Sequence, residues 1–152
     1  MKIALFLDTD GVMNMYRNDE IKRKYEKFKK GLLDYNYILR PYPKKIERLN
    51  KIIQKYNLDV YIFSAWTQEE LENIYPFKIS GDTNKNTKKV IEILSNYDIA
   101  IMIDDEVSYY KNDFICIEEK ISFLQPYYEE GMVLKDFKKL ENIIKGFYDK
   151  KK

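Results

Sequence analysis

Histidine is absent from the 152 residues of this chain. Without an imidazole, the chain cannot form a Ser-His-Asp or Cys-His triad, a His-ligated zinc site or a histidine phosphotransfer site. Proton transfer near neutral pH must therefore use carboxylates, lysine or tyrosine. The enzyme classes that depend on histidine are excluded.

Cysteine is also scarce, because Cys116 is the single thiol of the chain. No intramolecular disulfide can form, which favours a reducing compartment and so predicts a cytoplasmic protein. Cys116 lies within an apolar run, and we expect it to be buried in a strand and inert. A phosphatase of the Cys-x5-Arg type is excluded because position 122 is a serine.

Long apolar runs are missing as well. None reaches the ~20 residues that a membrane span needs, and the apolar start of the chain meets acidic residues too soon for a signal peptide. We therefore expect no membrane partner. The hydrophobic content of 45% and the net charge of +2 are ordinary for a globular protein. We expect one domain over residues 1–152, without an obligate protein partner.

Four short apolar segments predict strands that are buried on both faces, because their hydrophobic residues do not alternate with polar ones. They are residues 2–7, 59–63, 99–103 and 113–117. Hydrophobic residues recur at helical spacing in residues 44–56, 66–75, 88–97 and 135–148. The second of these helices opens with a capping box, Thr67 and Glu70. The alternation predicts an α/β fold with a doubly wound, mainly parallel sheet and helices on both faces.

Residues 14–41 interrupt this alternation directly after the first strand. They contain an amphipathic and very basic stretch, residues 22–30. We interpret the segment as a small cap inserted over the edge of the sheet. It would serve either as a lid or as a contact for nucleic acid, and its plainer interpretation is a solvated helix face.

Polar side chains follow three of the predicted strands, where each strand ends. They are Asp8 and Asp10 after the first strand, Ser64 after the second, and Asp104 and Asp105 after the third. In an open parallel sheet, ligands bind beyond the carboxyl ends of the strands. We expect these side chains to meet in one crevice, with a lysine from the start of the helix that precedes the third strand.

Such a crevice suits phosphate chemistry. Four carboxylates repel one another and need a counterion, and oxygen ligands alone select a hard cation, Mg²⁺ above all. Ser64 and a lysine would partner a bound phosphate, and a carboxylate can attack phosphorus to give an aspartyl-phosphate. Lys89 is our first choice for that lysine, with Lys88 and Lys85 as alternatives.

The ordered set of motifs resembles the haloacid dehalogenase-like (HAD) phosphatase superfamily. An apolar strand leads into D-x-D-G at residues 8–11, a second ends at Ser64, a lysine follows at Lys89, and a third strand ends in the acidic pair at residues 104–105. The motifs cover roughly residues 1–117. The resemblance implies a HAD-like Rossmannoid fold for the sheet.

A closer resemblance is to the compact HAD domains associated with RNA-repair proteins. Their pattern is similar to five stretches of this chain. They are D-x-D-G-V-x-N at residues 8–14, S-x-W at residues 64–66, the basic Lys89 shortly before E-I at residues 92–93, D-D-E at residues 104–106, and G-M at residues 131–132. Those domains usually have an arginine after the tryptophan, where this chain has Thr67. The departure concerns the identity of the substrate rather than the chemistry.

The resemblance implies a role for each matched residue. Asp8 would be the nucleophile and a metal ligand, and Asp10 would protonate the leaving oxygen and then activate water. The main-chain carbonyl of Asp10 and the carboxylate of Asp105 would complete the protein's share of Mg²⁺ ligands, with Asp104 behind them orienting the lysine. Ser64 and Lys89 would hold the phosphoryl oxygens.

These observations predict a phosphomonoesterase, a phosphoric monoester hydrolase with two open substrate classes. Phosphorylated nucleic-acid ends follow from the closer resemblance, and free nucleotides or other small phosphate esters are the alternative. A module that binds phosphate without turnover is the alternative of another class. A P-loop kinase or NTPase is poorly supported because no G-x-x-x-x-G-K-[S/T] loop is present.

Overall fold

The computed structural model describes residues 1–14, 18–32 and 40–150. Its centre is a five-stranded sheet in the order β3-β2-β1-β4-β5, and every pair of neighbouring strands is parallel. The strands are β1 (Ile3–Leu7), β2 (Asp59–Ile62), β3 (Ile79–Asp82), β4 (Ile99–Ile103) and β5 (Ile121–Leu124). The prediction of an α/β fold with a parallel sheet is confirmed, and the arrangement is Rossmann-like.

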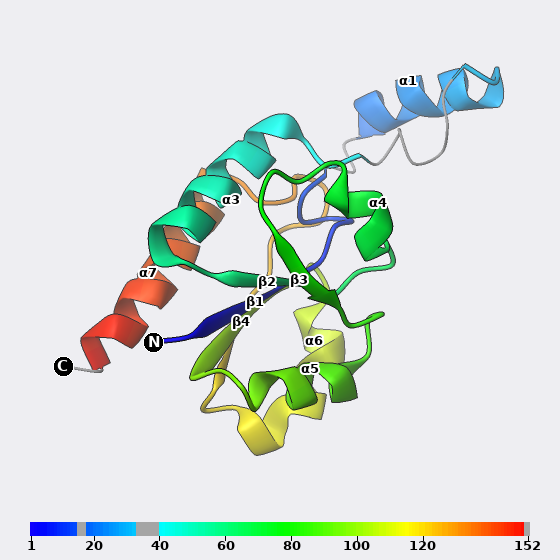
Figure 1. Cartoon of the computed structure of the whole chain (residues 1–152). Coiled ribbons are helices and arrows are strands. Elements are labelled where there is room, and N and C mark those ends of the chain that lie inside the picture. The colour runs from blue at the N-terminus through cyan, green and yellow to red at the C-terminus, as the bar shows by residue number, and fades with distance from the viewer. Residues whose placement is uncertain (15–17, 33–39, 151–152) are drawn as a thin grey trace.

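Strand β1 is central and buried along its whole length. Its side chains alternate between two cores, because successive residues of a strand point to opposite faces. Leu5 packs in the core that α3 (Pro43–Tyr56) and α7 (Leu134–Lys150) cover, whereas Phe6 packs in the core beneath α5 (Thr87–Leu94). Figure 1 shows these helices on the two sides of the sheet. The unbroken apolar run of β1 therefore reflects burial on both faces.

The predicted helices are present with shifted ends. The capping box of Thr67 and Glu70 forms as expected, but its helix, α4 (Gln68–Glu72), is shorter than predicted. Helix α3 begins with proline and ends before Asn57, whose φ of 52° is left-handed and stops the helix. In the part of the chain that the structure describes, no helix is long and apolar enough to cross a membrane.

The fourth predicted strand, residues 113–117, is wrong. These residues belong to a 3₁₀ helix, η1 (Lys111–Ile117), which follows the short helix α6 (Val107–Tyr110) directly. Phe114 is buried and Ile117 half-buried at the spacing of one 3₁₀ turn, while Cys116 between them is exposed. The expectation of a buried Cys116 is wrong for the same reason. Strands β3 and β5 were not predicted.

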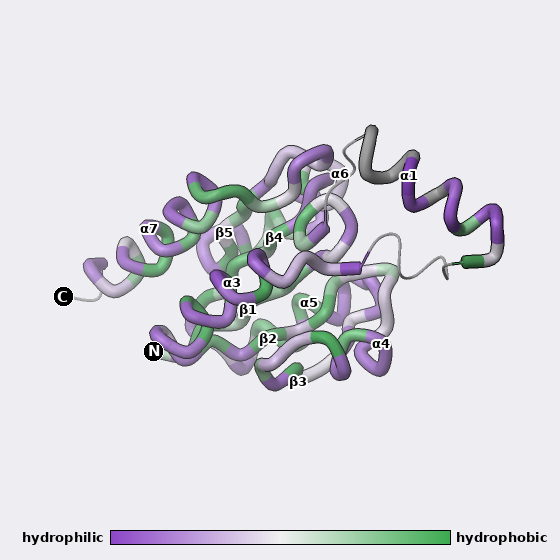
Figure 2. The backbone as a smooth tube through the Cα atoms, turned by 90° about the horizontal axis from the view of Figure 1, so that it is seen from above, coloured by the Kyte–Doolittle hydropathy of each residue, from purple (hydrophilic) through white to green (hydrophobic). Residues whose placement is uncertain are grey.

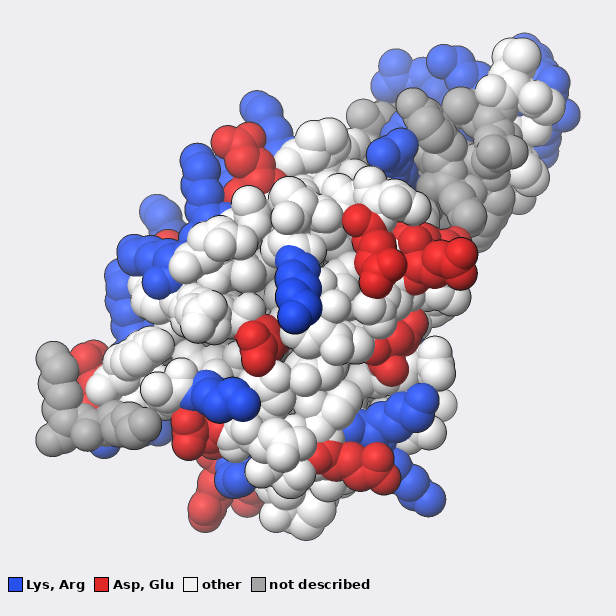
Figure 3. Space-filling model, in the orientation of Figure 1, with Lys and Arg blue, Asp and Glu red and all other residues white. Residues whose placement is uncertain are grey.

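The basic stretch of the insertion forms α1 (Asn18–Lys29). Figures 1 and 2 show α1 projecting from the body on the side toward which β1 runs, and Figure 2 shows its mostly hydrophilic residues. Lysine and arginine gather over it in Figure 3. Lys24 Nζ lies 5.2 Å from the ring centre of Tyr42, at the start of α3. Residues 15–17 and 33–39 of the expected cap lie outside the described residues.

Candidate active site

Asp8 and Asp104 lie side by side where β1 and β4 end. The register pairs Leu7 with Ile103, and the Asp8 amide donates to the Ile103 carbonyl at 3.0 Å, so the ladder continues one residue beyond the strand. Both aspartates are buried. Since parallel strands end at the same edge of a sheet, two residues 96 positions apart meet there.

Asp105 joins these two aspartates in a compact cluster. One carboxylate oxygen from each of Asp8, Asp104 and Asp105 lies within 4.8 Å of the other two. Burial raises the pKa of Asp8 to about 8, with the nearby Asp104 adding to the rise. Burial raises the pKa of Asp104 as well. Asp104 Oδ2 is buried, and its charge is paired with the ammonium group of Lys85. A crowded set of buried carboxylate oxygens fits a hard cation such as Mg²⁺.

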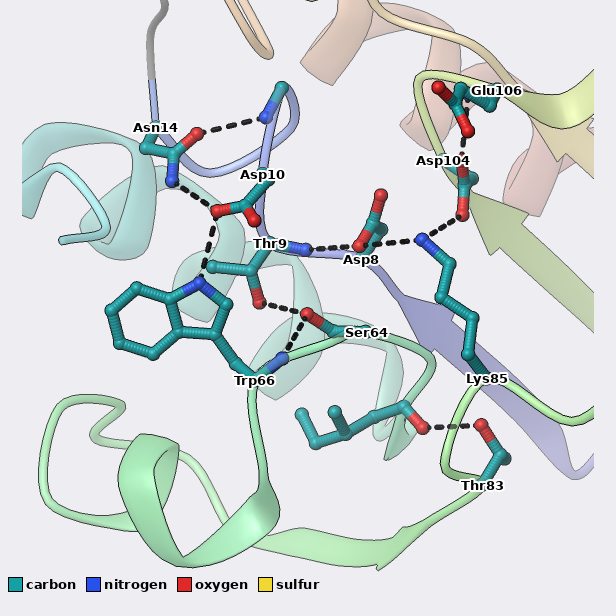
Figure 4. A network of polar contacts seen from close by, with 12 residues as sticks. Asp8, Thr9, Asp10, Asn14, Ser64, Trp66, Thr83, Lys85, Asp104 and Glu106 are labelled. Carbon is teal, nitrogen blue, oxygen red and sulfur yellow. Dashed lines mark hydrogen bonds and ion pairs between the residues drawn. The ribbon is translucent and has the colours of Figure 1, made fainter. Parts of the chain in front are cut away.

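The lysine beside this cluster is Lys85. Its Nζ lies 3.3 Å from Asp8 Oδ1 and 3.4 Å from Asp104 Oδ2 (Figure 4), and it faces the rings of Phe63 and Tyr110 at 5.6 and 5.5 Å. Burial alone would lower the pKa of Lys85, but the two carboxylates outweigh burial and raise it. Lys85 is therefore charged and offsets part of the acidic cluster.

The structure does not bring Lys89 to the cluster. The side chain of Lys89 is exposed on α5, where its main-chain amide donates to the capping Asn86. Lys85, held as an alternative, precedes that helix instead. Asn84 and Lys85 have φ angles of 51° and 58°, and two successive left-handed residues turn the chain toward the carboxylate cluster.

The loop that carries Lys85 is fastened to the end of β2. Both the amide and the hydroxyl of Thr83 donate to the Ile62 carbonyl, at 2.9 and 2.7 Å. Because Thr83 directly follows β3, Lys85 lies just beyond the carboxyl end of that strand. The ends of β1, β2, β3 and β4 therefore all contribute residues to this edge of the sheet. The missed signal was β3 itself: its sequence, Ile-Ser-Gly-Asp, has a single hydrophobic residue.

Asp10 is held by two donors on one oxygen. Asn14 Nδ2 and Trp66 Nε1 both donate to Asp10 Oδ1, at 2.9 and 3.0 Å (Figure 4). Asn14 in turn accepts from the amide of Gly11. Two donors on Oδ1 leave Oδ2 as the oxygen that can carry a proton. Trp66 is a buried residue of the core, and its indole N–H also positions a carboxylate.

Ser64 is buried beneath the loop that follows β1. Its hydroxyl donates to Thr9 Oγ1 at 2.9 Å and accepts from the amide of Trp66 at 3.0 Å. The hydroxyl thus links the ends of β1 and β2. Contact with a phosphoryl oxygen would need rotation of this hydroxyl away from Thr9.

Two glycines bring the surrounding loops close together. Gly11 has a φ of 75°, and a side chain there would collide with the carboxylate of Asp105. Gly131 has a φ of 64°, and a side chain there would collide with the carbonyls of Val12 and Asn14. The amide of Met132 donates to the Val12 carbonyl at 2.8 Å. Residues 131–132 therefore brace the loop that bears Asp8 and Asp10.

No family model, no curated protein and no solved structure matches this chain. The site must therefore be judged on its own geometry. That geometry consists of three clustered carboxylates, a charged lysine and a separately held aspartate at the carboxyl ends of the strands. It suits metal binding, nucleophilic attack and proton transfer by carboxylates.

Proposed function

We propose that this protein is a Mg²⁺-dependent phosphomonoesterase that works through an aspartyl-phosphate on Asp8. The observation that carries the proposal is the buried cluster of Asp8, Asp104 and Asp105 with Lys85 at the carboxyl ends of parallel strands. The proposal includes a HAD-like, doubly wound fold, with residues 14–41 as a small cap. It rests on the motif order in the sequence together with this geometry.

Asp8, Asp105 and the main-chain carbonyl of Asp10 would hold the Mg²⁺ ion. Asp104 accepts from the amide of Glu106 at 2.7 Å and pairs with Lys85, which suits a role in orienting the lysine. When bound, the ion offsets the negative charge of the phosphoryl group. The net negative charge of three carboxylates against one lysine leaves room for a divalent cation.

Asp8 attacks phosphorus, and the bond between phosphorus and the leaving oxygen breaks as the new bond forms. Asp10 gives its Oδ2 proton to that leaving oxygen, because Oδ1 is occupied by the donors from Asn14 and Trp66. Asp10 then takes a proton from water, which attacks the phosphorus of the aspartyl-phosphate. Inorganic phosphate leaves, and the Asp8 carboxylate is restored.

Lys85 supports the first step in two ways. Its charge favours the ionised form of Asp8, which alone is nucleophilic, against the effect of burial. It also lies where a phosphoryl oxygen next to Asp8 would need a cation. We therefore assign to Lys85 the role that the sequence gave to Lys89, with Ser64 as the second partner of the phosphoryl group.

The test is turnover of a generic aryl phosphate by the full chain, with and without metal. We expect phosphate release that requires Mg²⁺ and stops in EDTA, and acid quenching should trap phosphate covalently on the protein. Phosphate release at an undiminished rate in EDTA would contradict the metal assignment. Binding of phosphate without any turnover would favour the non-catalytic module.

A further inference from the structure

A small pocket opens beside the acidic cluster, between the end of β5 and the start of α7. Its volume is about 320 Å³, and Asp105 forms part of its wall. Because Asp105 also belongs to the carboxylate cluster, the pocket adjoins the proposed reaction centre. A volume near 300 Å³ is at the lower end of pockets that hold small organic ligands.

Two exposed aromatic rings line this pocket. Tyr127 and Tyr128 are 57% and 48% exposed, and their ring centres lie 5.2 Å apart at an angle of 63°. The turn that carries them is ordered, since the amides of Glu130 and Gly131 both donate to the Tyr127 carbonyl. An ordered turn that presents large apolar rings to solvent provides a surface on which a flat ring can stack.

Basic residues stand on another wall of the same pocket. Lys135 and Lys139 both line it, and their spacing of four residues puts them on one face of α7. Acidic side chains are present too: Glu130 and Asp136 also line the pocket, and Asp136 accepts from the amide of Val133 at 2.9 Å. The pocket thus combines two aromatic rings, two lysines and, with Asp105, three carboxylates, and it lies beside a site proposed to bind phosphate.

We propose that this pocket binds the leaving group of the substrate, and that the leaving group is a nucleotide. Its base stacks on Tyr127 and Tyr128, and a second phosphate meets Lys135 and Lys139, while the phosphate to be removed lies at Asp8. This inference rests on the proposed function and narrows its substrates to phosphate esters that carry a base and a further phosphate. Both a phosphorylated oligonucleotide end and a nucleoside bisphosphate have this chemistry.

The test compares substrates that differ only in what the pocket would bind. Acetyl phosphate has neither base nor second phosphate, a nucleoside monophosphate adds the base, and a nucleoside bisphosphate or an end-phosphorylated dinucleotide adds both. The double variant Tyr127→Ala/Tyr128→Ala should raise KM about tenfold or more for every substrate with a base. It should leave acetyl phosphate unchanged. Tyr148→Ala, at the far end of α7, is the matched control.

The lysines are tested separately. Lys135→Gln/Lys139→Gln should raise KM and flatten its salt dependence only for substrates with a second phosphate, because each phosphate contact releases a counterion. Lys138→Gln on the same helix, which does not line the pocket, is the control. A larger effect on the dinucleotide than on the bisphosphate identifies nucleic-acid ends as the source, and equal effects identify free nucleotides.

Equal losses for acetyl phosphate and for the nucleotides would overturn the proposal, because the turn would then only support Asp105. Unchanged nucleotide kinetics in both double variants would overturn it too. Equilibrium binding of the bisphosphate to the Asp8→Asn protein separates this proposal from the proposed function. Binding that is lost with the tyrosines, in a chain whose wild type hydrolyses no phosphate, would retain the pocket and reject the enzyme.

Discussion

Two polar clusters lie at opposite ends of the sheet, and their carboxylates have different kinds of partners. Near the amino ends of the strands, Tyr97 donates to Asp59 at 2.6 Å, and the hydroxyls of Tyr61 and Tyr97 are 2.8 Å apart. The carboxylate there accepts from a neutral hydroxyl, which is itself bonded to a second hydroxyl. At the carboxyl ends, the Asp8 cluster gathers three carboxylates around one lysine.

The comparison distinguishes a polar cluster that stabilises the fold from one whose carboxylates are suited to catalysis. Burial, followed by the hydrogen bond to Asp59, raises the pKa of Tyr97, so this tyrosine remains a neutral donor at every physiological pH. In the Asp8 cluster, burial and the neighbouring Asp104 raise the pKa of Asp8 to about 8 even with Lys85 beside it. A paired network stabilises a fold, whereas a crowded one needs a proton or a bound cation to offset its charge.

Replacing one aspartate in each cluster by asparagine should give the largest difference in turnover between two variants. Asp8→Asn should lower turnover about 10⁴-fold or more, because the nucleophile is lost, and it should abolish the trapped phosphoenzyme. Asp59→Asn should keep turnover but reduce the free energy of unfolding by about 1.5 kcal/mol, since a hydrogen bond to a charged group is weakened. Kinetics and chemical denaturation of both variants measure the contrast; wild-type turnover by Asp8→Asn would reassign the nucleophile.

Asp10 should show its role through the leaving group. Asp10→Asn should slow hydrolysis of an alkyl phosphate about 10³-fold, because the leaving oxygen is no longer protonated. Acetyl phosphate, with a good leaving group, should suffer less. Trp66→Phe keeps an aromatic ring but removes the donor to Asp10 Oδ1. We therefore expect a smaller loss of turnover that depends on the leaving group in the same way. Equal losses on both substrates would argue against general acid catalysis by Asp10.

The two lysines sharpen the comparison within the site. Lys85→Gln should lower kcat/KM about 10²-fold, as removal of one charge-stabilising group does in other enzymes. Lys89→Gln, an equal change in charge on the exposed face of α5, should have no measurable effect. Steady-state kinetics on one aryl phosphate suffice, with circular dichroism to check folding. The opposite ranking would restore Lys89 and contradict the role of Lys85.

The pH dependence of stability is the mildest test. The pKa of Asp8 rises from an ordinary value of about 3.9 in the unfolded chain to about 8 in the folded one. Between these values the folded chain keeps a proton that the unfolded chain has lost, so stability is highest below the lower value and falls as pH rises through the upper one. In EDTA, Tm should fall from pH 5 to pH 8, less so for Asp8→Asn, and Mg²⁺ should restore more of it at pH 8. A slope that Asp8→Asn leaves unchanged would contradict the assignment.

Much of this arrangement follows from the sequence. The apolar runs of β1 and β4 predicted strands that are buried on both faces. The acids directly after them, Asp8 and Asp104, meet because the two strands are parallel neighbours. The strand predicted at residues 113–117 is wrong because the apolar residues of this short run, three positions apart, fit one 3₁₀ turn as well as a strand. Strand β3 escaped notice because its residues are mostly polar.

The sequence by itself determined which carboxylates come together, because burial on both faces of a parallel sheet imposes a local pattern that fixes where each strand ends. The tertiary structure alone decided which lysine joins them and which donors hold Asp10. Lys85 reaches the carboxylate cluster through two left-handed residues after an unpredicted strand, and Trp66 reaches Asp10 across 56 positions. Contacts of this kind depend on how loops fold over one another, and no periodicity in the chain encodes them.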